Sequence, residues 1–399
     1  MKLHRGLLMA VGELVHQVVF GKAYADKLIA ALLKSQSRWG KRDRSFVVET
    51  TQDVLRHFRL LATISGQNYT DAQLDMQLVL AAWALKQGYE LPDWEEWKKY
   101  DITGIHSALL EPLTPTDKYS MPDWLYELGK QQLGERWDDE LAALNQPAKL
   151  VIRVNTLRTT KEKLRKLLAD KGIVTENIVE VPDALQLPAN KYLLKLPEYE
   201  TGLFEIQDAA SQMVAPYLEV APGMTVIDAC AGGGGKTLHL ANLMQNKGNI
   251  IACDVEPIKL KSLERRLQRA QVPTAKVQLI DKNLVASLKH KADRVLLDVP
   301  CTGLGVLKRN PDTKWLLSPD SIAGIEGTQR EILASYHTML KPGGKLVYAT
   351  CSILPSEDAA QVQWFLQQQP EYTLLKEQYL WPSQFGYDGF YMALLEKGG

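Results

Sequence analysis

The segment Thr225-Val-Ile-Asp-Ala-Cys-Ala-Gly-Gly-Gly-Gly-Lys-Thr237 joins a short apolar run to four glycines and then to a helical pattern. The apolar run predicts a buried strand, and the glycines permit a tight turn whose backbone N–H groups approach a ligand closely. A P-loop would need glycine at the position of Cys230, and the third glycine of GxGxxG would fall on Thr237 or Leu238. The turn therefore predicts a nucleotide site that is neither of these two kinds.

This turn lies at the start of a regular alternation of strands and helices. From about residue 205, apolar runs of strand length recur between stretches of helical periodicity. Such alternation is typical of a doubly wound parallel sheet in an α/β fold. We expect strands at 225–229, 249–253, 276–280, 294–298, 345–350 and 389–395, and helices at about 236–246, 257–270, 320–339 and 356–368.

Acidic residues lie at the ends of the first three of these strands. Asp254 ends the second strand, where a carboxylate accepts hydrogen bonds from ribose hydroxyls, and Asp281 ends the third, where it would face the exocyclic amine of adenine. Any one of these acids alone is more often a helix cap. Together with the glycine-rich turn, they favour S-adenosylmethionine as the cofactor.

Two cysteines follow further strands, Cys301 in the run Asp298-Val-Pro-Cys301 and Cys351 in Thr350-Cys-Ser352. Side chains at the carboxyl ends of such strands point into the ligand crevice. Carbon 5 of cytosine becomes nucleophilic once a thiolate has added to carbon 6, and its proton must later leave. This covalent catalysis needs a cysteine of lowered pKa and a carboxyl group at the edge of the base, a place that Asp298 suits.

A free cysteine is more often a small buried apolar residue than a catalyst. We favour that interpretation for the side chains of Cys230 and Cys253, which lie on or beside apolar strands. Cys301 and Cys351 lie instead where strands leave for loops, beside Pro300 and Ser352. For these two the pattern favours catalysis.

Length and composition are those of a soluble protein of two or three domains, with 399 residues, 45% hydrophobic and 24% charged, and a net charge of zero. The four cysteines form no CxxC pair and show no zinc spacing, so we expect no metal and a reducing, cytoplasmic location. We expect neither a signal peptide nor a membrane-spanning helix. A monomer is the expected state.

Charge is distributed unevenly. Residues 61–148 hold 6 Lys and Arg against 15 Asp and Glu, whereas residues 149–172 hold 8 against 2, and residues 1–60 are also basic. Such basic blocks suit a phosphate backbone, although solvated helix faces are an equally good explanation. The residues expected to contact RNA are Arg38, Lys41, Arg42, Arg44, Arg153, Arg158, Lys161 and Arg309.

The region before the alternation divides into parts. Residues 1–110 have helical periodicity, the proline- and threonine-rich run 111–117 is typical of a linker, and another helical stretch spans about 122–144. Residues 149–200 mix strand and helix patterns, with a basic amphipathic helix at 160–171. They predict a small α/β module.

Across essentially its whole length the chain resembles the RsmB-type (Fmu/Sun) RNA cytosine-5 methyltransferases. DNA cytosine methyltransferases have only the Pro-Cys nucleophile, so the presence of both cysteine motifs makes the resemblance specific. The motifs that match are DACAGGGGKT at 228–237, CDVEP at 253–257, DVPCTGLGVLKRNPDTKW at 298–315, YATCSILPSED at 348–358, GLFEIQDAASQ at 202–212 and IRVNTLRTTKEKL at 152–164.

The resemblance implies three parts: a NusB-like helical RNA-binding domain at 1–115, a helical linker with a small RNA-binding module at 121–200, and a Rossmann-like class I methyltransferase domain at 201–399. It implies methylation of cytidine C5 in RNA, with 16S ribosomal RNA as the favoured target. A tRNA methyltransferase of the same chemistry is the main alternative. A second is an RNA-binding assembly or antitermination factor in which the methyltransferase fold is vestigial.

The resemblance also implies residue roles. Cys351 would add to the base, Cys301 would assist proton removal or product release, and Asp298 would contact the base. The residues implied to hold S-adenosylmethionine are Cys230, Ala231, Gly232, Gly233, Gly234, Gly235, Lys236, Asp254, Asp281 and Asp298.

The chain departs from the family pattern at two places. Gly232 and Gly233 replace the usual Ala and Pro of the turn, which loosens the unbound loop. We therefore predict that Gly233→Pro tightens cofactor binding. Asp358 replaces the more usual Asn, and the sequence gives no physical account of its effect.

Overall fold

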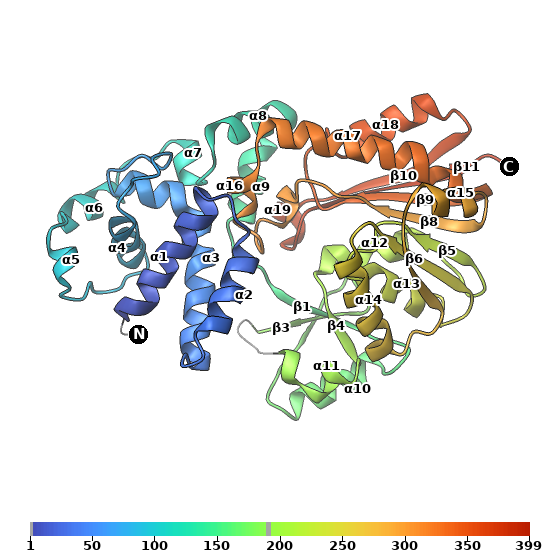
Figure 1. Ribbon diagram of the computed structural model, residues 1–399, viewed down its shortest axis with the longest axis horizontal. Helices are drawn as coiled ribbons and strands as arrows, with labels where there is room; N and C mark the ends of the chain where they lie inside the picture. Colours follow the sequence, from blue (N-terminus) through green and yellow to red (C-terminus); the bar gives the residue numbers. More distant parts are fainter. Residues whose placement is uncertain (1–2, 189–192) are drawn as a thin grey trace. The chain divides into compact units, whose positions relative to one another are not determined.

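The computed structural model describes residues 3–188 and 193–399, so four residues of the small module, 189–192, lie outside the described part (Figure 1). Contacts divide the chain into two compact units. One comprises Met1–Gln146 with Val306–Pro319, and the other comprises Pro147–Gly305 with Asp320–Gly399. Within the described residues, no helix has both the length and the apolar character needed to cross a membrane.

A seven-stranded sheet forms the centre of the second unit, counted over the described residues, with the order β10-β11-β9-β8-β5-β6-β7. The five strands from β9 to β7 in this order run parallel, whereas β11 is antiparallel to both β9 and β10. The strands are β5 (Thr225–Asp228), β6 (Asn249–Asp254), β7 (Ala275–Leu279), β8 (Ala292–Asp298), β9 (Leu340–Thr350), β10 (Tyr372–Leu380) and β11 (Phe390–Lys397).

These strands confirm the expected α/β fold, with two corrections. The strand expected at 389–395 is antiparallel, and its partner β10 was not anticipated. Tyr372–Leu380 lies at the edge of the sheet and is exposed or half-buried along most of its length, so its sequence lacks the apolar run found in the central strands.

Helices cover both faces of this sheet. Figure 1 shows α17 and α18 along one face and α12 and α13 along the other. The direction of the strand order reverses at β5, which lies between β8 and β6, and ligands of such sheets bind in the crevice at this point. The helices are α12 (Ala209–Tyr217), α13 (Gly235–Leu243), α14 (Pro257–Ala270), α15 (Lys282–Ser287), α17 (Pro319–Tyr336), α18 (Ala359–Gln368) and α19 (Pro382–Phe385).

The small module of the second unit is an antiparallel sheet of order β2-β3-β1-β4. Helix α10 packs Leu164 and Leu168 into its core against Ile152 and Phe204, while the charged face of the helix remains exposed. The elements are β1 (Leu150–Val154), α10 (Lys161–Ala169), β2 (Glu176–Asn177), β3 (Ala184–Leu187), α11 (Pro197–Glu200) and β4 (Phe204–Ile206).

The first unit is helical, as expected. Its apolar core is built mainly from α1, α3 and α4 and also includes Trp315, which comes from the later segment Val306–Pro319. The helices are α1 (Arg5–Val19), α2 (Ala25–Ser35), α3 (Lys41–Ile64), α4 (Met76–Lys86), α5 (Glu95–Lys98), α6 (Ile102–Ala108), α7 (Pro115–Lys118), α8 (Asp123–Leu133), α9 (Arg136–Leu144) and α16 (Thr313–Leu316).

Helix α3 bends at His57, whose backbone angles are not helical. The carbonyl of Leu55 accepts a hydrogen bond from the Trp315 indole at 2.7 Å, and the carbonyl of Arg56 accepts one from the Lys314 ammonium at 2.7 Å. On the other side of the bend, the backbone N–H of Arg59 donates to the Ser120 hydroxyl at 2.8 Å. Because side chains satisfy these buried groups, the bend does not leave them unpaired.

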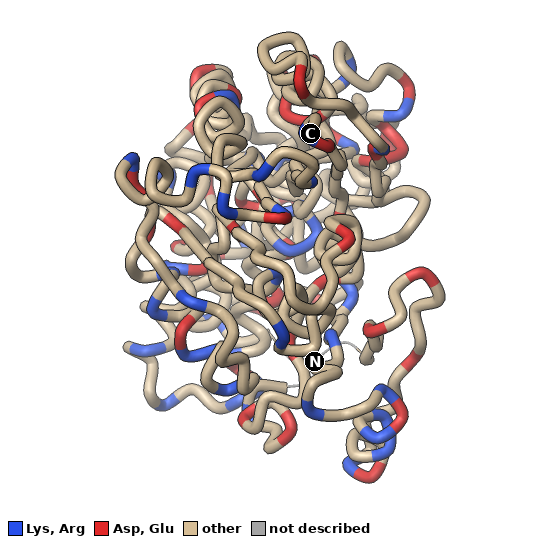
Figure 2. The backbone as a smooth tube through the Cα atoms, turned by 90° about the vertical axis from the view of Figure 1, so that its right-hand side faces the viewer, with Lys and Arg blue, Asp and Glu red and all other residues tan. Residues whose placement is uncertain are grey.

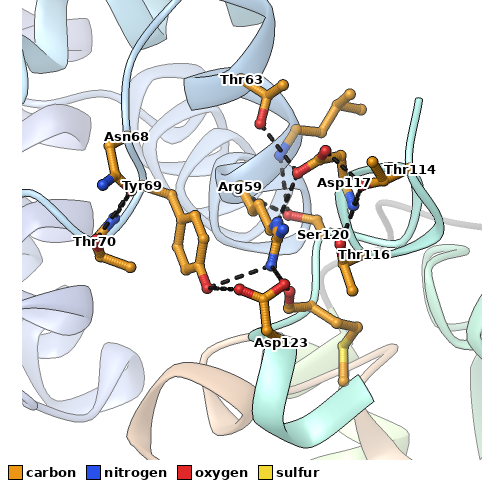
Figure 3. A network of polar contacts seen from close by, with 12 residues as sticks. Arg59, Thr63, Asn68, Tyr69, Thr70, Thr114, Thr116, Asp117, Ser120 and Asp123 are labelled. Carbon is orange, nitrogen blue, oxygen red and sulfur yellow. Dashed lines mark hydrogen bonds and ion pairs between the residues drawn. The ribbon is translucent and has the colours of Figure 1, made fainter. Parts of the chain in front are cut away.

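Part of the run expected to be a linker is folded. Figure 3 shows Arg59 between the carboxylates of Asp117 and Asp123, at 2.6 Å from each, with Tyr69 alongside. Asp117 belongs to α7, whose first residue Pro115 is suited to a helix start. The guanidinium thus joins α3 to α7 and to the start of α8.

Candidate active site

The glycine-rich turn connects β5 to α13. Gly232 and Gly234 have positive φ angles of 53° and 86°, whereas Gly233 between them is outside the positive-φ region. A Cβ on Gly234 would lie 2.0 Å from the Leu263 side chain. Two of the glycines are therefore required by backbone conformation, whereas Gly233 and Gly235 are outside the positive-φ region.

Two arginines fix the carbonyls of this turn. Arg153 of β1 donates to the Gly235 carbonyl at 2.7 Å and to the side chain of Gln207, and Arg266 of α14 donates to the Gly233 carbonyl at 2.5 Å. Arg153 is only 1% exposed. Arg153, which was predicted to contact RNA, is thus buried beside the turn, where it orients backbone groups. Its place in a buried strand gave no sequence signal for these contacts.

The predicted acids lie around the same turn. Asp254, 7% exposed, accepts a hydrogen bond from the Gly232 N–H at 2.8 Å and one from the Glu256 N–H at 2.9 Å. Asp281 is exposed and caps α15, accepting from the Leu284 N–H at 2.7 Å. Asp281 is therefore a helix cap, the alternative that the sequence offered for such acids. Asp281 nevertheless also lies at the wall of the cavity described next.

A cavity of about 1280 Å³ lies beside the turn. Its lining combines carboxylates, which accept hydrogen bonds, with exposed apolar side chains such as Val255 at 66%, and this combination suits a ribose and a flat purine ring. Sequence reasoning missed its far wall on α17, where the pattern predicted a helix and nothing more. The residues that line it include Cys230, Gly232, Asp254, Asp281, Asp298, Ser335 and Tyr336.

Asp298, at the end of β8, forms an ion pair with Lys236 of α13, with Nζ to Oδ2 at 2.6 Å. Lys236 is 9% exposed, and its ammonium lies 5.1 Å from the centre of the Phe390 ring. A buried charge is costly unless it is paired, and the Asp298 carboxylate is the partner of the Lys236 ammonium. The lysine is thus tied to the end of the strand that leads to Cys301.

The two cysteines are brought together. Cys301 Sγ and Cys351 Sγ lie 3.3 Å apart, although they are 50 residues apart in sequence. Hydrogen bonding to Cys351, together with burial, holds the pKa of the Cys301 thiol well above its ordinary value. Either sulfur can donate the hydrogen bond between them, and both lie where they could act on the same ring.

The remaining predicted RNA contacts are dispersed. Arg38, Lys41 and Arg42 are exposed on the helical unit, whereas the Arg44 guanidinium is used by three backbone carbonyls, of Trp39, Leu33 and Gln36. Arg158, Lys161 and Arg309 are half-buried. Figure 2 shows that Lys and Arg are interspersed with Asp and Glu along the backbone.

Comparisons with known proteins identify the family of the chain. A family model described as 16S rRNA methyltransferase RsmB/F matches residues 215–396, and a model of the ferredoxin-like domain of RsmF/B-like methyltransferases matches residues 121–191. The probable ribosomal RNA small subunit methyltransferase B of Synechocystis sp. is 35% identical over 309 residues, which cover 72% of this chain and 69% of that protein. The chain belongs to the RsmB/F methyltransferase family.

Other members and solved structures are also similar. The ribosomal RNA small subunit methyltransferase B of Vibrio cholerae is 37% identical, over 70% of this chain and 66% of its own length. The crystal structure of PH0851 superposes with a TM-score of 0.82 at 27% identity, covering 100% of both chains. A methyltransferase homologue from Pyrococcus horikoshii has a TM-score of 0.64 at 29% identity, over 71% of this chain and 97% of its own. The matches to the two sequence relatives span about two thirds of their length.

Proposed function

We propose that this RsmB/F family member transfers the methyl group of S-adenosylmethionine to carbon 5 of a cytidine in small-subunit ribosomal RNA. The family relationship supports the RNA target, because the relatives are ribosomal RNA small subunit methyltransferases. The cavity beside the glycine-rich turn, with Asp254 and Asp281 at its wall, supports the cofactor. A solved structure named NSun6 from Pyrococcus horikoshii, with SFG, shares the fold at a TM-score of 0.65.

The contact between the two sulfurs carries the proposal. The Cys351 thiolate bonds to carbon 6 of the ring, and the displaced electron pair makes carbon 5 nucleophilic. Bound S-adenosylmethionine supplies an electrophilic methyl group. After transfer, a base takes the carbon 5 proton, and the electron pair of that carbon–hydrogen bond restores the carbon 5–carbon 6 double bond. The carbon 6–sulfur bond breaks at the same time, and its electron pair returns to Cys351. Cys301, whose sulfur lies 3.3 Å from that of Cys351, assists removal of the carbon 5 proton or release of the product.

Asp298 would orient the base. Its ion pair with Lys236 supports a carboxylate that accepts a hydrogen bond from the exocyclic amine of cytosine. A uracil presents a carbonyl at that position, so the same carboxylate would disfavour it. This arrangement requires a base that is unpaired or flipped out of a helix, because carbon 6 is reached from the face of the ring.

We further propose that residues 1–115 and 121–200 bind the RNA around the target. The exposed basic face of α10 and the exposed residues Arg38, Lys41 and Arg42 support phosphate contacts. The part of the RNA affinity that comes from phosphate contacts falls as the salt concentration rises. The preference for cytosine at Asp298 should not depend on salt in this way.

The test uses small-subunit ribosomal RNA that lacks the modification, with tRNA as the comparison substrate. We expect Cys301→Ser to accumulate a protein–RNA adduct that survives denaturing electrophoresis, because the covalent bond forms and resolves slowly. Cys351→Ser should form no adduct and methylate no cytidine, as checked by bisulfite sequencing. An adduct with Cys351→Ser, or normal turnover by that variant, would show that the nucleophile is a different residue.

A further inference from the structure

The residues on both sides of the two cysteines are held by one buried polar cluster. Beside Cys301, the Pro300 carbonyl accepts from the Gln329 amide at 3.0 Å, and Thr302 donates to Glu357 through its N–H at 2.8 Å and its hydroxyl at 2.5 Å. Gln329 also donates to Glu357 at 3.1 Å. The backbone on either side of Cys301 is therefore tied to Glu357, directly or through one amide.

The same cluster holds the neighbours of Cys351. The Ser352 hydroxyl donates to Glu357, and the Thr350 hydroxyl donates to Asp358 at 2.5 Å. The Tyr348 hydroxyl donates to the Glu357 carbonyl at 2.6 Å. A single side chain, Glu357, thus accepts hydrogen bonds from the residue that follows each cysteine.

Glu357 is fully buried, as are Gln329 and Ser352, with exposed fractions of 0%. Burial raises the pKa of the Glu357 carboxyl above its ordinary value, while its hydrogen bonds act in the opposite direction. A buried carboxyl group is costly unless its oxygens are well paired, and here both oxygens are used. Its place in the sequence, five and six residues after Ser352 and Cys351, gave no sign of a contact with Thr302.

We propose that Glu357 is a positioning residue, which keeps the Cys301 and Cys351 sulfurs close enough to act on the same ring. The inference rests on the proposed function, because it assigns Glu357 a part in that reaction. The loops that hold Cys301 and Cys351 follow β8 and β9. The pairing of these strands does not fix the direction of side chains beyond the last residue of each strand. Glu357 joins these loops at the residues next to the sulfurs.

Disulfide formation measures this positioning without RNA. Diamide takes up two electrons and two protons from a pair of thiols, becomes the hydrazine and leaves a disulfide, so its rate with Cys301 and Cys351 reports how often the sulfurs meet. Peptide mapping by mass spectrometry identifies the bond. We expect Glu357→Ala to slow formation of the Cys301–Cys351 disulfide by about tenfold to a hundredfold, the scale of a misplacement of about 1 Å.

The matched control is Glu264→Ala, which removes an exposed carboxylate from α14. It should oxidise at the rate of the unmodified protein. In Glu357→Ala, kcat for methylation should fall with the disulfide rate, while the calorimetric affinity for S-adenosylmethionine stays within about twofold, since Glu357 does not line the cofactor cavity. Oxidation of Glu357→Ala at the unmodified rate would overturn the proposal.

A second pair of variants decides the matter if Glu357→Ala does not fold. Thr302→Val removes one donor to Glu357 with little change of shape, and Thr302→Ser restores the hydroxyl. We expect slow disulfide formation in the valine variant and recovery in the serine variant, and equal rates in the two would contradict the proposal. If these rates behave as expected but no cytidine is methylated, the positioning role stands and the proposed function fails.

Discussion

Asp358 is a single residue for which the structure supplies the physical account that the sequence lacked. Its side chain is fully buried, one oxygen accepts from Thr350, and within the described residues the other oxygen has no hydrogen-bond partner. Burial raises the pKa of this carboxyl well above its ordinary value. The native state therefore opposes ionisation at this position.

We predict that Asp358→Asn stabilises the protein, and increasingly so as pH rises. Below the ordinary aspartate pKa of 3.8, the carboxyl is protonated in both the folded and the unfolded chain, and the two proteins should be similar. Above it, the unfolded chain releases the proton while the folded chain retains it, so the unmodified protein loses stability. Denaturant unfolding at several pH values measures the difference. If the difference in the free energy of unfolding between the two proteins became smaller from pH 4 to pH 7, that result would contradict the raised pKa of Asp358.

Among single residues, the sequence predicted which side chains would lie together but not what holds them. Cys301, Cys351 and Asp298 follow apolar strands in short, recognisable motifs, so their meeting at one edge of a sheet could be expected. Glu357 and Arg153 gave no such signal, because an acid in a loop and an arginine in a strand are ordinary features. Their roles depend on contacts with residues 55 and 82 positions away, which only the fold supplies.

Among the elements, the glycine-rich turn is the one whose conformation the sequence left open. We predict that Gly233→Pro tightens S-adenosylmethionine binding by about twofold to fivefold, from a smaller ordering entropy of ~0.4–1 kcal/mol. The matched variant Gly232→Ala should instead weaken binding by about tenfold, because φ is 53° there and a left-handed conformation costs a residue with a Cβ about 1–2 kcal/mol. Calorimetric titration measures both, and tighter binding by Gly232→Ala would show that the turn changes conformation when the cofactor binds.

Helix α3 depends on a serine from another part of the chain. We predict that Ser120→Ala destabilises the helical unit by about 1–3 kcal/mol, because the buried N–H of Arg59 loses its acceptor at the bend. The control Ser35→Ala removes an exposed hydroxyl at the end of α2 and should cost much less. Thermal unfolding of both variants provides the measurement. Equal losses would mean that water replaces the Ser120 hydroxyl.

The sequence predicted the positions of helices and strands better than it predicted their bends. Periodicity located β5, β6 and β8 within two residues, since each contains a short apolar run, but β9 begins at Leu340, five residues before the expected 345. It predicted helical structure over residues 1–110, but it did not predict the bend at His57 within α3, which spans Lys41–Ile64. The bend is stable because Trp315, Lys314 and Ser120 satisfy the groups it frees, and no local pattern around residue 57 records those partners.

In the whole molecule, the folding units do not follow the order of the chain. The sequence suggested successive parts with boundaries near 115 and 200. Contacts in the structure group Val306–Pro319, a segment that follows the Cys301 loop, with the helical residues 1–146. A boundary of this kind is invisible to composition and periodicity, because the segment is short and its apolar anchor is a single tryptophan.

The segment supplies part of the core of the helical unit. The Trp315 ring lies 5.6 Å from that of Phe58 and 6.2 Å from that of Tyr69, and its indole donates to the Leu55 carbonyl. Asp312 accepts from the Ala25 N–H at 3.1 Å, and the Trp315 carbonyl accepts from Lys22 at 2.6 Å. Without the segment, residues 1–146 would have a cavity the size of an indole and unpaired carbonyls at the bend of α3.

We therefore predict that a fragment of residues 1–146 is markedly less stable than the helical unit of the full chain, by about 3–5 kcal/mol, the usual cost of deleting a buried aromatic side chain. A peptide of residues 304–320, added in trans, should bind the fragment and raise its unfolding midpoint. The same peptide with Trp315→Ala should not, because it cannot fill the cavity or reach the Leu55 carbonyl. Calorimetric unfolding of the fragment with each peptide makes the comparison. Equal midpoints with and without the unmodified peptide would show that residues 1–146 fold as an independent domain.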